Sequence, residues 1–146
     1  MILYLPFLFQ GIIMTFDEFY FHEKRGLPRW EIIGHPLDTL TTALTLSIPI
    51  FFEYSVSSEL GFIIFATFSC LFITKDEFVH ADHCSKSENW THAILFILHP
   101  ITFMATYFIW KNYPENIFLK VQFVLVTLFM FYQIIRWSSL WKALQK

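Results

Sequence analysis

The sequence predicts an all-α, polytopic integral membrane protein with about five transmembrane helices in a single domain, residues 1–146. Composition is the first observation: 55% of the residues are hydrophobic and only 15% are charged, against about 25% charged in ordinary globular chains. Mean hydropathy is the second, at +0.51, although a domain this small needs many polar residues to cover its surface in water. Third, the apolar residues form continuous runs, which favour helices over the alternating pattern of barrel strands.

Five apolar runs approach the roughly 20 residues that a helix needs to cross a bilayer. We expect the helices to extend into the flanking polar segments, because several of these runs are short. The first run has neither the basic region nor the small-residue cleavage site of a signal peptide, so we expect it to be a retained transmembrane helix. The runs are 1–16, 37–52, 60–74, 92–110 and 117–135.

An internal repeat is indicated by two similar polar segments. Residues 15–19 read Thr-Phe-Asp-Glu-Phe and residues 74–78 read Thr-Lys-Asp-Glu-Phe. Each follows an apolar run and continues through histidines to another. The pattern predicts one repeat over 1–55, a second over 60–110 and a fifth helix at 117–136, with the first four helices in a pseudo-two-fold bundle. Membrane proteins built from such repeats often have their functional site between them.

The basic residues predict the orientation. Five helices place both polar segments and the C-terminal tail on one side of the membrane. Eight of the ten lysines and arginines belong to that side. Cytoplasmic loops are enriched in these residues, so we expect the N-terminus outside and both polar segments and the C-terminus in the cytoplasm. The eight are Lys24, Arg25, Arg29, Lys75, Lys86, Arg136, Lys142 and Lys146.

The ionisable residues are concentrated in segments 17–38 and 76–99, which contain all six histidines and nine of the twelve acids. Four acid–histidine pairs are four residues apart, a spacing that places both side chains on one face of a helix. Four such faces turned inward would form a pocket of oxygen and nitrogen ligands at the cytoplasmic end. The predicted metal ligands are Glu18, His22, Glu31, His35, Asp76, His80, His83, Glu88 and His92. Residues expected to hold those ligands or to carry protons are Asp17, Asp38, Glu77 and His99.

Carboxylate and imidazole together favour transition metals such as iron, manganese or zinc. Bundle di-iron and di-manganese proteins use the same ligand types. The number of acids and histidines predicts two ions, with iron favoured and zinc or manganese as alternatives. The competing interpretation is that these residues are a solvated polar surface at the ends of the helices.

One short motif, His80-x-x-His83, resembles one part of the histidine boxes of membrane desaturases and hydroxylases. The resemblance covers four residues, and the chain lacks the paired adjacent histidines of those families.

The function that this pattern favours is a membrane metalloenzyme with a dinuclear, di-iron-type site that oxidises a lipid-soluble substrate. A membrane lipid entering sideways from the bilayer is the expected partner. Nucleic acid is not expected, because the formal net charge is −2. A zinc-dependent lipid hydrolase with the same site is the alternative, and a transition-metal transporter ranks third because polar residues on the far side are few.

Overall fold

The computed structural model describes residues 1–138, which are helical apart from short connections. Lys142, Lys146 and the predicted cytoplasmic C-terminus lie outside the described residues. After a 3-10 turn at Ile2–Tyr4, the elements are α1 (Leu5–Phe16), a π-helical turn (Asp17–His22), α2 (Glu23–Arg25), α3 (Arg29–Phe51), α4 (Val56–Phe72), a second 3-10 turn (Ile73–Asp76), α5 (Glu77–His83), α6 (Lys86–Asn112) and α7 (Ile117–Trp137).

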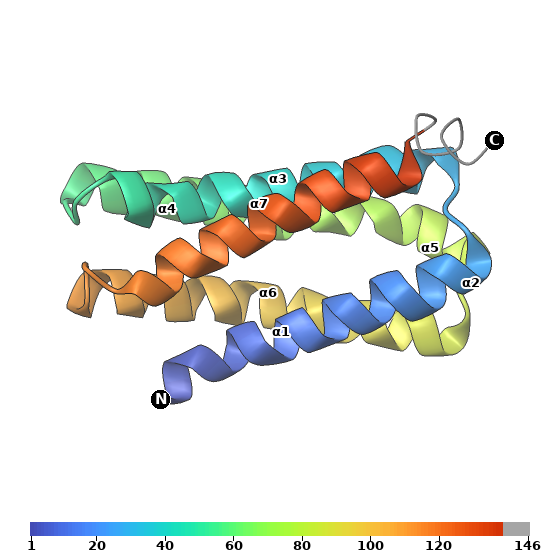
Figure 1. The fold of residues 1–146 in the computed structure, drawn as a ribbon, viewed down its shortest axis with the longest axis horizontal. Coiled ribbons are helices and arrows are strands. Elements are labelled where there is room, and N and C mark those ends of the chain that lie inside the picture. Colours follow the sequence, from blue (N-terminus) through green and yellow to red (C-terminus); the bar gives the residue numbers. More distant parts are fainter. Residues whose placement is uncertain (139–146) are drawn as a thin grey trace.

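The long helices form an elongated bundle (Figure 1). α3 packs mainly on α7 and α4, and α1 packs on α6. The N-terminus and the turns α3–α4 and α6–α7 lie at one end. At the opposite end lie α2, α5 and the last turn of α7. We call this opposite end the histidine end, because residues 17–35 and 76–92 contain five of the six histidines.

Four helical stretches are long and apolar enough to cross a membrane, which confirms the prediction of an all-helical protein suited to a bilayer. α3 is not among them, because His35, Asp38 and several threonines interrupt its apolar sequence. The predicted extension into polar flanks is confirmed, since α3 begins at Arg29 and α6 at Lys86. The four stretches are Ile2–Arg25, Val56–His83, Lys86–Asn112 and Ile117–Trp137.

Short polar motifs fix where the helices begin. Ser55 and Ser85 each accept a hydrogen bond from a backbone N–H in the first turn of the following helix, and both form capping boxes. In the second box the reciprocal partner is Glu88, which is therefore held in the first turn of α6. Gly26 has φ +76°, a backbone conformation that glycine adopts without strain, and it reverses the chain between α2 and α3.

Polar residues gather inside the bundle and apolar residues outside. Among the described residues, sixteen buried side chains are polar or charged and ten are hydrophobic. Large apolar side chains such as Leu8, Ile12 and Leu125 are more than half exposed. This distribution is the reverse of a water-soluble domain and is the one expected when the surrounding solvent is hydrocarbon.

A hydrogen-bonded chain of four side chains, here called the polar clasp, joins four helices in the middle of the bundle. His99 on α6 lies 3.2 Å from Gln10 on α1 and 2.9 Å from Ser69 on α4. Ser69 in turn lies 2.8 Å from Thr41 on α3. Interhelical hydrogen bonds of this kind stabilise helix packing in lipid, where hydrophobic burial contributes little.

The two Asp-Glu-Phe segments differ in local structure. The first begins a π-helical turn, and its Glu18 is buried. In the second, Asp76 ends a 3-10 turn and Glu77 is exposed. The pseudo-two-fold relation between the repeats stays a prediction.

Candidate metal centre

The histidine end brings together side chains from four separate helical turns. The π-helical turn after α1 supplies Asp17, Glu18 and His22. A π-helical turn pairs residues five apart, in addition to the ordinary spacing of four. His22 Nδ1 is hydrogen-bonded to Glu18 Oε2 at 3.0 Å, and its Nε2 lies 3.2 Å from Asp17 Oδ2. The wide turn therefore directs two carboxylates at one imidazole.

Two other helices begin at this end and place their acid–histidine pairs in the first turns. Glu31 and His35 lie near the start of α3, and Glu88 and His92 near the start of α6. His92 Nε2 is hydrogen-bonded to both carboxylate oxygens of Asp17, at 3.1 and 3.2 Å. These contacts join α6 to the turn after α1, across 75 residues of sequence.

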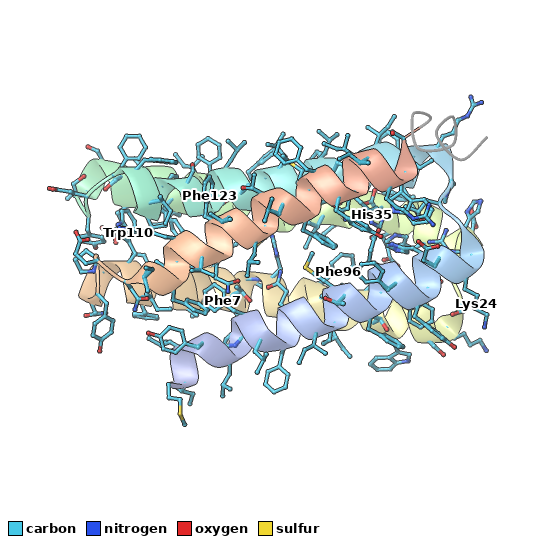
Figure 2. All side chains as sticks on the ribbon, viewed as in Figure 1. Phe7, Lys24, His35, Phe96, Trp110 and Phe123 are labelled. Atoms are coloured by element: carbon cyan, nitrogen blue, oxygen red, sulfur yellow. The ribbon has the colours of Figure 1, made fainter. Side chains whose placement is uncertain are left out.

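Four imidazoles form a closed ring, here called the histidine ring: His22, His35, His80 and His92. Successive ring centroids are separated by 4.6 Å (His22–His35), 6.4 Å (His35–His80), 4.1 Å (His80–His92) and 6.4 Å (His92–His22). His35 lies at the end of the bundle opposite Trp110 (Figure 2). Since each histidine comes from a different helical element, only the tertiary fold assembles the ring.

The ring carries four groups of side chains whose ligand atoms lie within 4.8 Å of one another, close enough to hold a metal ion. Each histidine belongs to two neighbouring groups, so groups on opposite sides of the ring share no residue. Two ions could therefore bind at once without competing for a side chain. The groups are Asp17–His22–Glu88–His92, Glu18–His22–His35, Glu31–His35–His80 and His80–Cys84–His92.

Several polar atoms of the ring are buried without a hydrogen-bond partner in the described structure. Five of them are imidazole nitrogens, including both nitrogens of His80 and also His22 Nε2, whose only contact is the ion pair with Asp17. Beside the ring, Glu31 Oε1 is a sixth atom without a hydrogen-bond partner. Glu31 Oε1 lies 3.8 Å from His80 Nε2, which is too far for a hydrogen bond. A buried polar atom without a partner costs about 1–3 kcal/mol. Six in one place point to a ligand that accepts electron pairs from nitrogen and oxygen, as a metal ion does.

Negatively charged side chains also surround the ring. Asp17, Glu18, Glu31 and Glu88 are all buried, with exposed fractions of 5% or less. Arg25 supplies a guanidinium, which donates hydrogen bonds to Glu31 Oε2 at 2.7 Å and to Glu88 Oε1 at 2.9 and 3.1 Å. Burying carboxylates is costly unless opposite charge balances them. Metal cations or protonated imidazoles would supply the remaining positive charge.

A tryptophan holds one of these carboxylates from outside the ring. Trp137 Nε1, in the last turn of α7, donates a hydrogen bond to Glu18 Oε1 at 2.6 Å. The other oxygen of Glu18 contacts His22. Such outer contacts fix the orientation of metal-binding carboxylates and tune their affinity.

Seven of the nine predicted ligands belong to the candidate groups: Glu18, His22, Glu31, His35, His80, Glu88 and His92. Asp76 and His83 do not. Asp76 instead accepts hydrogen bonds from Trp30 Nε1 at 3.0 Å and Lys75 Nζ at 2.8 Å. His83 is exposed.

The four predicted supporting residues have different positions. Asp17 lies within a candidate group, closer to the ring than the sequence indicated. Asp38 pairs with Lys75 at 2.6 Å. Glu77 is exposed, and His99 lies in the polar clasp.

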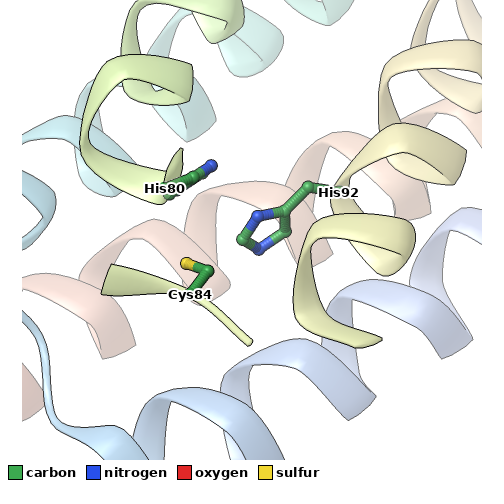
Figure 3. Close-up of side chains that lie close together, drawn as sticks. All are labelled: His80, Cys84 and His92. Atoms are coloured by element: carbon green, nitrogen blue, oxygen red, sulfur yellow. The ribbon is translucent and has the colours of Figure 1, made fainter. Parts of the chain in front are cut away.

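Cys84 is not among the predicted ligands, because one cysteine beside a histidine is a weak signal. The structure places its thiol in a group with His80 and His92, facing a common space (Figure 3). Burial raises the pKa of the Cys84 thiol to about 12, so without a metal the thiol stays protonated at neutral pH. Metal coordination would deprotonate it.

A long cavity of about 1030 Å³ leads away from the ring along the bundle. The four ring histidines line one end, and Met1, Tyr4 and Phe118 line the other. Between them the lining is mostly apolar, with Phe7 and Phe96 at successive positions along the bundle (Figure 2). An apolar molecule in this cavity would meet the ring at its end.

Comparisons with models of protein families, with curated proteins and with solved structures found no significant match to this chain.

Proposed function

We propose that this chain is a membrane-embedded metalloenzyme that binds two transition-metal ions at the histidine ring and oxidises a lipid-soluble substrate. The observation that carries the proposal is the set of five buried imidazole nitrogens without hydrogen-bond partners. A solvated polar surface would leave these nitrogens in water, whereas here they are buried. Two metal ions in opposite groups would bind one nitrogen of each ring histidine.

Two ions are supported by the arrangement of the four candidate groups. Asp17–His22–Glu88–His92 and Glu31–His35–His80 lie on opposite sides of the ring and share no residue. Each offers both carboxylate and imidazole, a mixture that suits iron or manganese as well as zinc. Iron is favoured for an oxidase, because this ligand set is the one that bundle di-iron proteins use.

For the membrane, we propose that α3 crosses the bilayer as a fifth helix, beside the four apolar stretches. Its packing on α4 and α7 supports this. Its polar residues include Thr39, Thr41 and Thr45, which are buried against neighbouring helices and kept from lipid. The excess of lysine and arginine at the histidine end supports a cytoplasmic position for the metal centre and an outside N-terminus. The first four helices would then form the pseudo-two-fold bundle.

The proposed chemistry needs dioxygen and an external reductant. For hydroxylation, one dioxygen, two protons and two electrons from a one-electron carrier protein convert R–H to R–OH and one water. When bound, the metal ions supply the redox chemistry that activates dioxygen. The chain's own contribution is to fix the carboxylates through Arg25 and Trp137 and to guide the apolar substrate through the cavity to the ring.

A zinc-dependent lipid hydrolase is the second candidate, and Cys84 favours it. Its Sγ belongs to a group with His80 and His92, and thiolate with imidazole is a common zinc ligand set. In that reaction a carboxylate such as Glu31 would act as general base toward water.

Elemental analysis and dioxygen uptake separate the two candidates. The protein is purified in mild detergent without chelators, and bound iron, manganese and zinc are measured. The oxidase proposal expects two iron ions per chain, and dioxygen consumption when a chemical reductant and a lipid extract are added. Zinc without iron, with release of fatty acids from the extract, would replace the oxidase with the hydrolase. Protein free of all three metals, and still free after incubation with each, would overturn both.

A further inference from the structure

A second group of polar side chains lines the cavity deeper in the bundle than the histidine ring. Three of them lie on the same helices as residues of the candidate metal centre, each seven residues from one of these. Two helical turns place residues on the same face of a helix, about 10 Å apart. All three side chains line the cavity that begins at the ring. The pairs are Gln10 with Asp17 on α1, Thr42 with His35 on α3 and His99 with His92 on α6.

Thr39 on α3 and Gln133 on α7 extend this group toward the ring. The Thr39 hydroxyl lies 2.7 Å from Gln133 Oε1, and both residues line the cavity. Thr39 is four residues after His35, and Gln133 is four residues before Trp137, whose indole contacts Glu18 at the ring. Four residues of helix span about 6 Å. We call the five residues the amide layer, and it lies about 6–10 Å from the ring along the bundle. They are Gln10, Thr39, Thr42, His99 and Gln133.

Each of the two amides in the layer is hydrogen-bonded at one end. Gln10 Nε2 lies 3.2 Å from His99 Nδ1, whereas Gln10 Oε1 is buried without a hydrogen-bond partner in the described structure. Gln133 is 3% exposed, and among the described residues the hydrogen bond of its amide is the one at Oε1. An amide end without a partner is costly in hydrocarbon. Two such ends beside one cavity indicate that a bound molecule completes them.

The chemistry of an amide defines the group that would bind here. An amide has a carbonyl acceptor at one end and an N–H donor at the other. A hydroxyl or an amide on the ligand can bond to either end, because it both donates and accepts, whereas an ether or ester can only accept.

The charges around the layer favour an uncharged group. The layer contains no acid, lysine or arginine, so a charged group would be buried there without a counter-ion. At the ring, two divalent metal ions and Arg25 would nearly balance the four buried carboxylates. The ring would therefore attract little charge of either sign to the layer.

We propose that the cavity binds a lipid with a hydroxyl or amide group within its hydrocarbon chain, several carbons from the end that occupies the histidine ring. This inference rests on the proposed function for the position of that end, and it adds a second recognition site in the amide layer. The in-chain group forms hydrogen bonds with Gln10 and Gln133. An extended chain advances about 1.2 Å per bond, since three backbone bonds of an extended polypeptide span about 3.5 Å. A separation of six bonds, about 7 Å, therefore matches the layer.

Competition binding tests this proposal with two isomeric diols. 1-Hexadecanol with a photoreactive diazirine at its last carbon labels the protein in detergent, and each diol is titrated as competitor. Hexadecane-1,7-diol places its second hydroxyl at the amide layer. Hexadecane-1,14-diol places it about 16 Å from the ring, at the level of Phe7 and Phe103. The isomers carry the same polar groups, so their ratio reports the position of the second hydroxyl. We expect the 1,7-diol to compete about tenfold more strongly.

Three variants locate the preference. Gln10→Met and Gln133→Met remove the amides and keep most of the side-chain volume. Each should reduce the tenfold preference to about threefold or less. Gln122→Met is the matched control, because Gln122 also lines the cavity but lies eleven residues, about 16 Å, further along α7 from the ring. It should keep the full preference. A ratio of two isomers is unchanged by a variant that only lowers stability.

Three outcomes would overturn the amide layer as a binding site: equal competition by the two diols, a full preference in both Gln10→Met and Gln133→Met, or an equal loss of preference in Gln122→Met. 7-Amino-1-hexadecanol, a cation at neutral pH, tests the charge. It should compete less strongly than the 1,7-diol, and equal or stronger competition would overturn the uncharged group.

Metal analysis of the same samples separates this inference from the proposed function. Two metal ions per chain, without a preference between the diols, would leave the metal centre and remove the amide layer. Protein that never binds metal, but prefers the 1,7-diol and loses this preference in Gln133→Met, would keep the amide layer and remove the metalloenzyme.

Discussion

The imidazole rings of His80 and His92 lie face to face, with centroids 4.1 Å apart and planes tilted by 34°. His80 is on α5 and His92 on α6, at either side of the connection that contains Cys84. Both residues are at least 95% buried. Neither nitrogen of His80 has a hydrogen-bond partner, and Nδ1 of His92 has none. The fold thus brings together two imidazoles that have three nitrogens without a hydrogen-bond partner, while His92 Nε2 is bonded to Asp17, and this arrangement supports the proposed metal site.

Substitution of a ring histidine should remove metal. His35→Ala and His92→Ala each delete a side chain shared by two candidate groups. We expect loss of most bound metal, beyond the roughly 10–100-fold loss of affinity typical of outer contacts. Metal content of the purified variants is the measurement.

His83→Ala is the matched control, because His83 is exposed and outside all four groups. It should keep its metal. Equal retention by all three variants would favour the solvated-surface interpretation.

Arg25 should be essential for stability. Its guanidinium contacts two buried carboxylates, Glu31 and Glu88. Arg25→Gln leaves both without this partner, and breaking a buried ion pair costs about 3–5 kcal/mol. Thermal unfolding in detergent should show a lowered Tm, and a chelator should increase the deficit because bound metal would also neutralise these acids. A variant as stable as the wild type, with and without chelator, would show that these contacts contribute little.

Arg136→Gln provides the comparison. Arg136 pairs with Glu23 at the surface of the bundle, where both side chains are partly exposed. Exposed ion pairs contribute about 0–1 kcal/mol, so this variant should lose much less stability than Arg25→Gln.

Trp137→Phe tests the outer contact to Glu18. It removes one hydrogen bond of 2.6 Å and keeps most of the aromatic volume. Metal affinity should fall by about 10–100-fold while the protein remains folded, as measured by competition with a chelator of known affinity. Trp90→Phe is the control, since Trp90 is 73% exposed. Identical affinities for the two variants would remove Trp137 from the site.

The polar clasp should contribute to stability without affecting metal. Ser69→Ala leaves His99 Nε2 and the Thr41 hydroxyl without their shared partner. Interhelical hydrogen bonds in membranes average about 0.6 kcal/mol, with a maximum near 1.7. We expect a loss of stability within about that range at each contact, and unchanged metal content. Ser57→Ala, at an exposed site in α4, should alter neither the stability nor the metal content.

Sequence periodicity predicted the parts of the site that lie within single helices. Glu31 with His35 and Glu88 with His92 are one turn apart in regular α-helices, so their spacing alone places each pair together. The contact between Asp17 and His22 depends on a π-helical turn, which no spacing rule for α-helices anticipates. The sequence therefore predicted a supporting role for Asp17, whereas the structure places it within a candidate group.

Other positions depend on tertiary structure. Asp76 is four residues before His80, but it ends a 3-10 turn and is directed toward Trp30 and Lys75. Cys84 reaches the ring only because α5 ends beside the start of α6. The all-helical architecture, with four stretches long and apolar enough to cross a membrane, was predictable from composition and the apolar runs. The arrangement of the four histidines in a closed ring was not predictable from the sequence, because it depends on how four helical turns meet.

The most direct test of the account is the number of metal ions per chain in the wild type and in two single variants. The account predicts two ions in the wild type. His22→Ala and His80→Ala each alter one of the two opposite groups, so each should retain fewer ions than the wild type. One ion per chain in the wild type, with His22 or His80 dispensable for its binding, would contradict a dinuclear site. Wild-type protein that binds none, even after incubation with iron, manganese and zinc, would contradict the metal centre altogether.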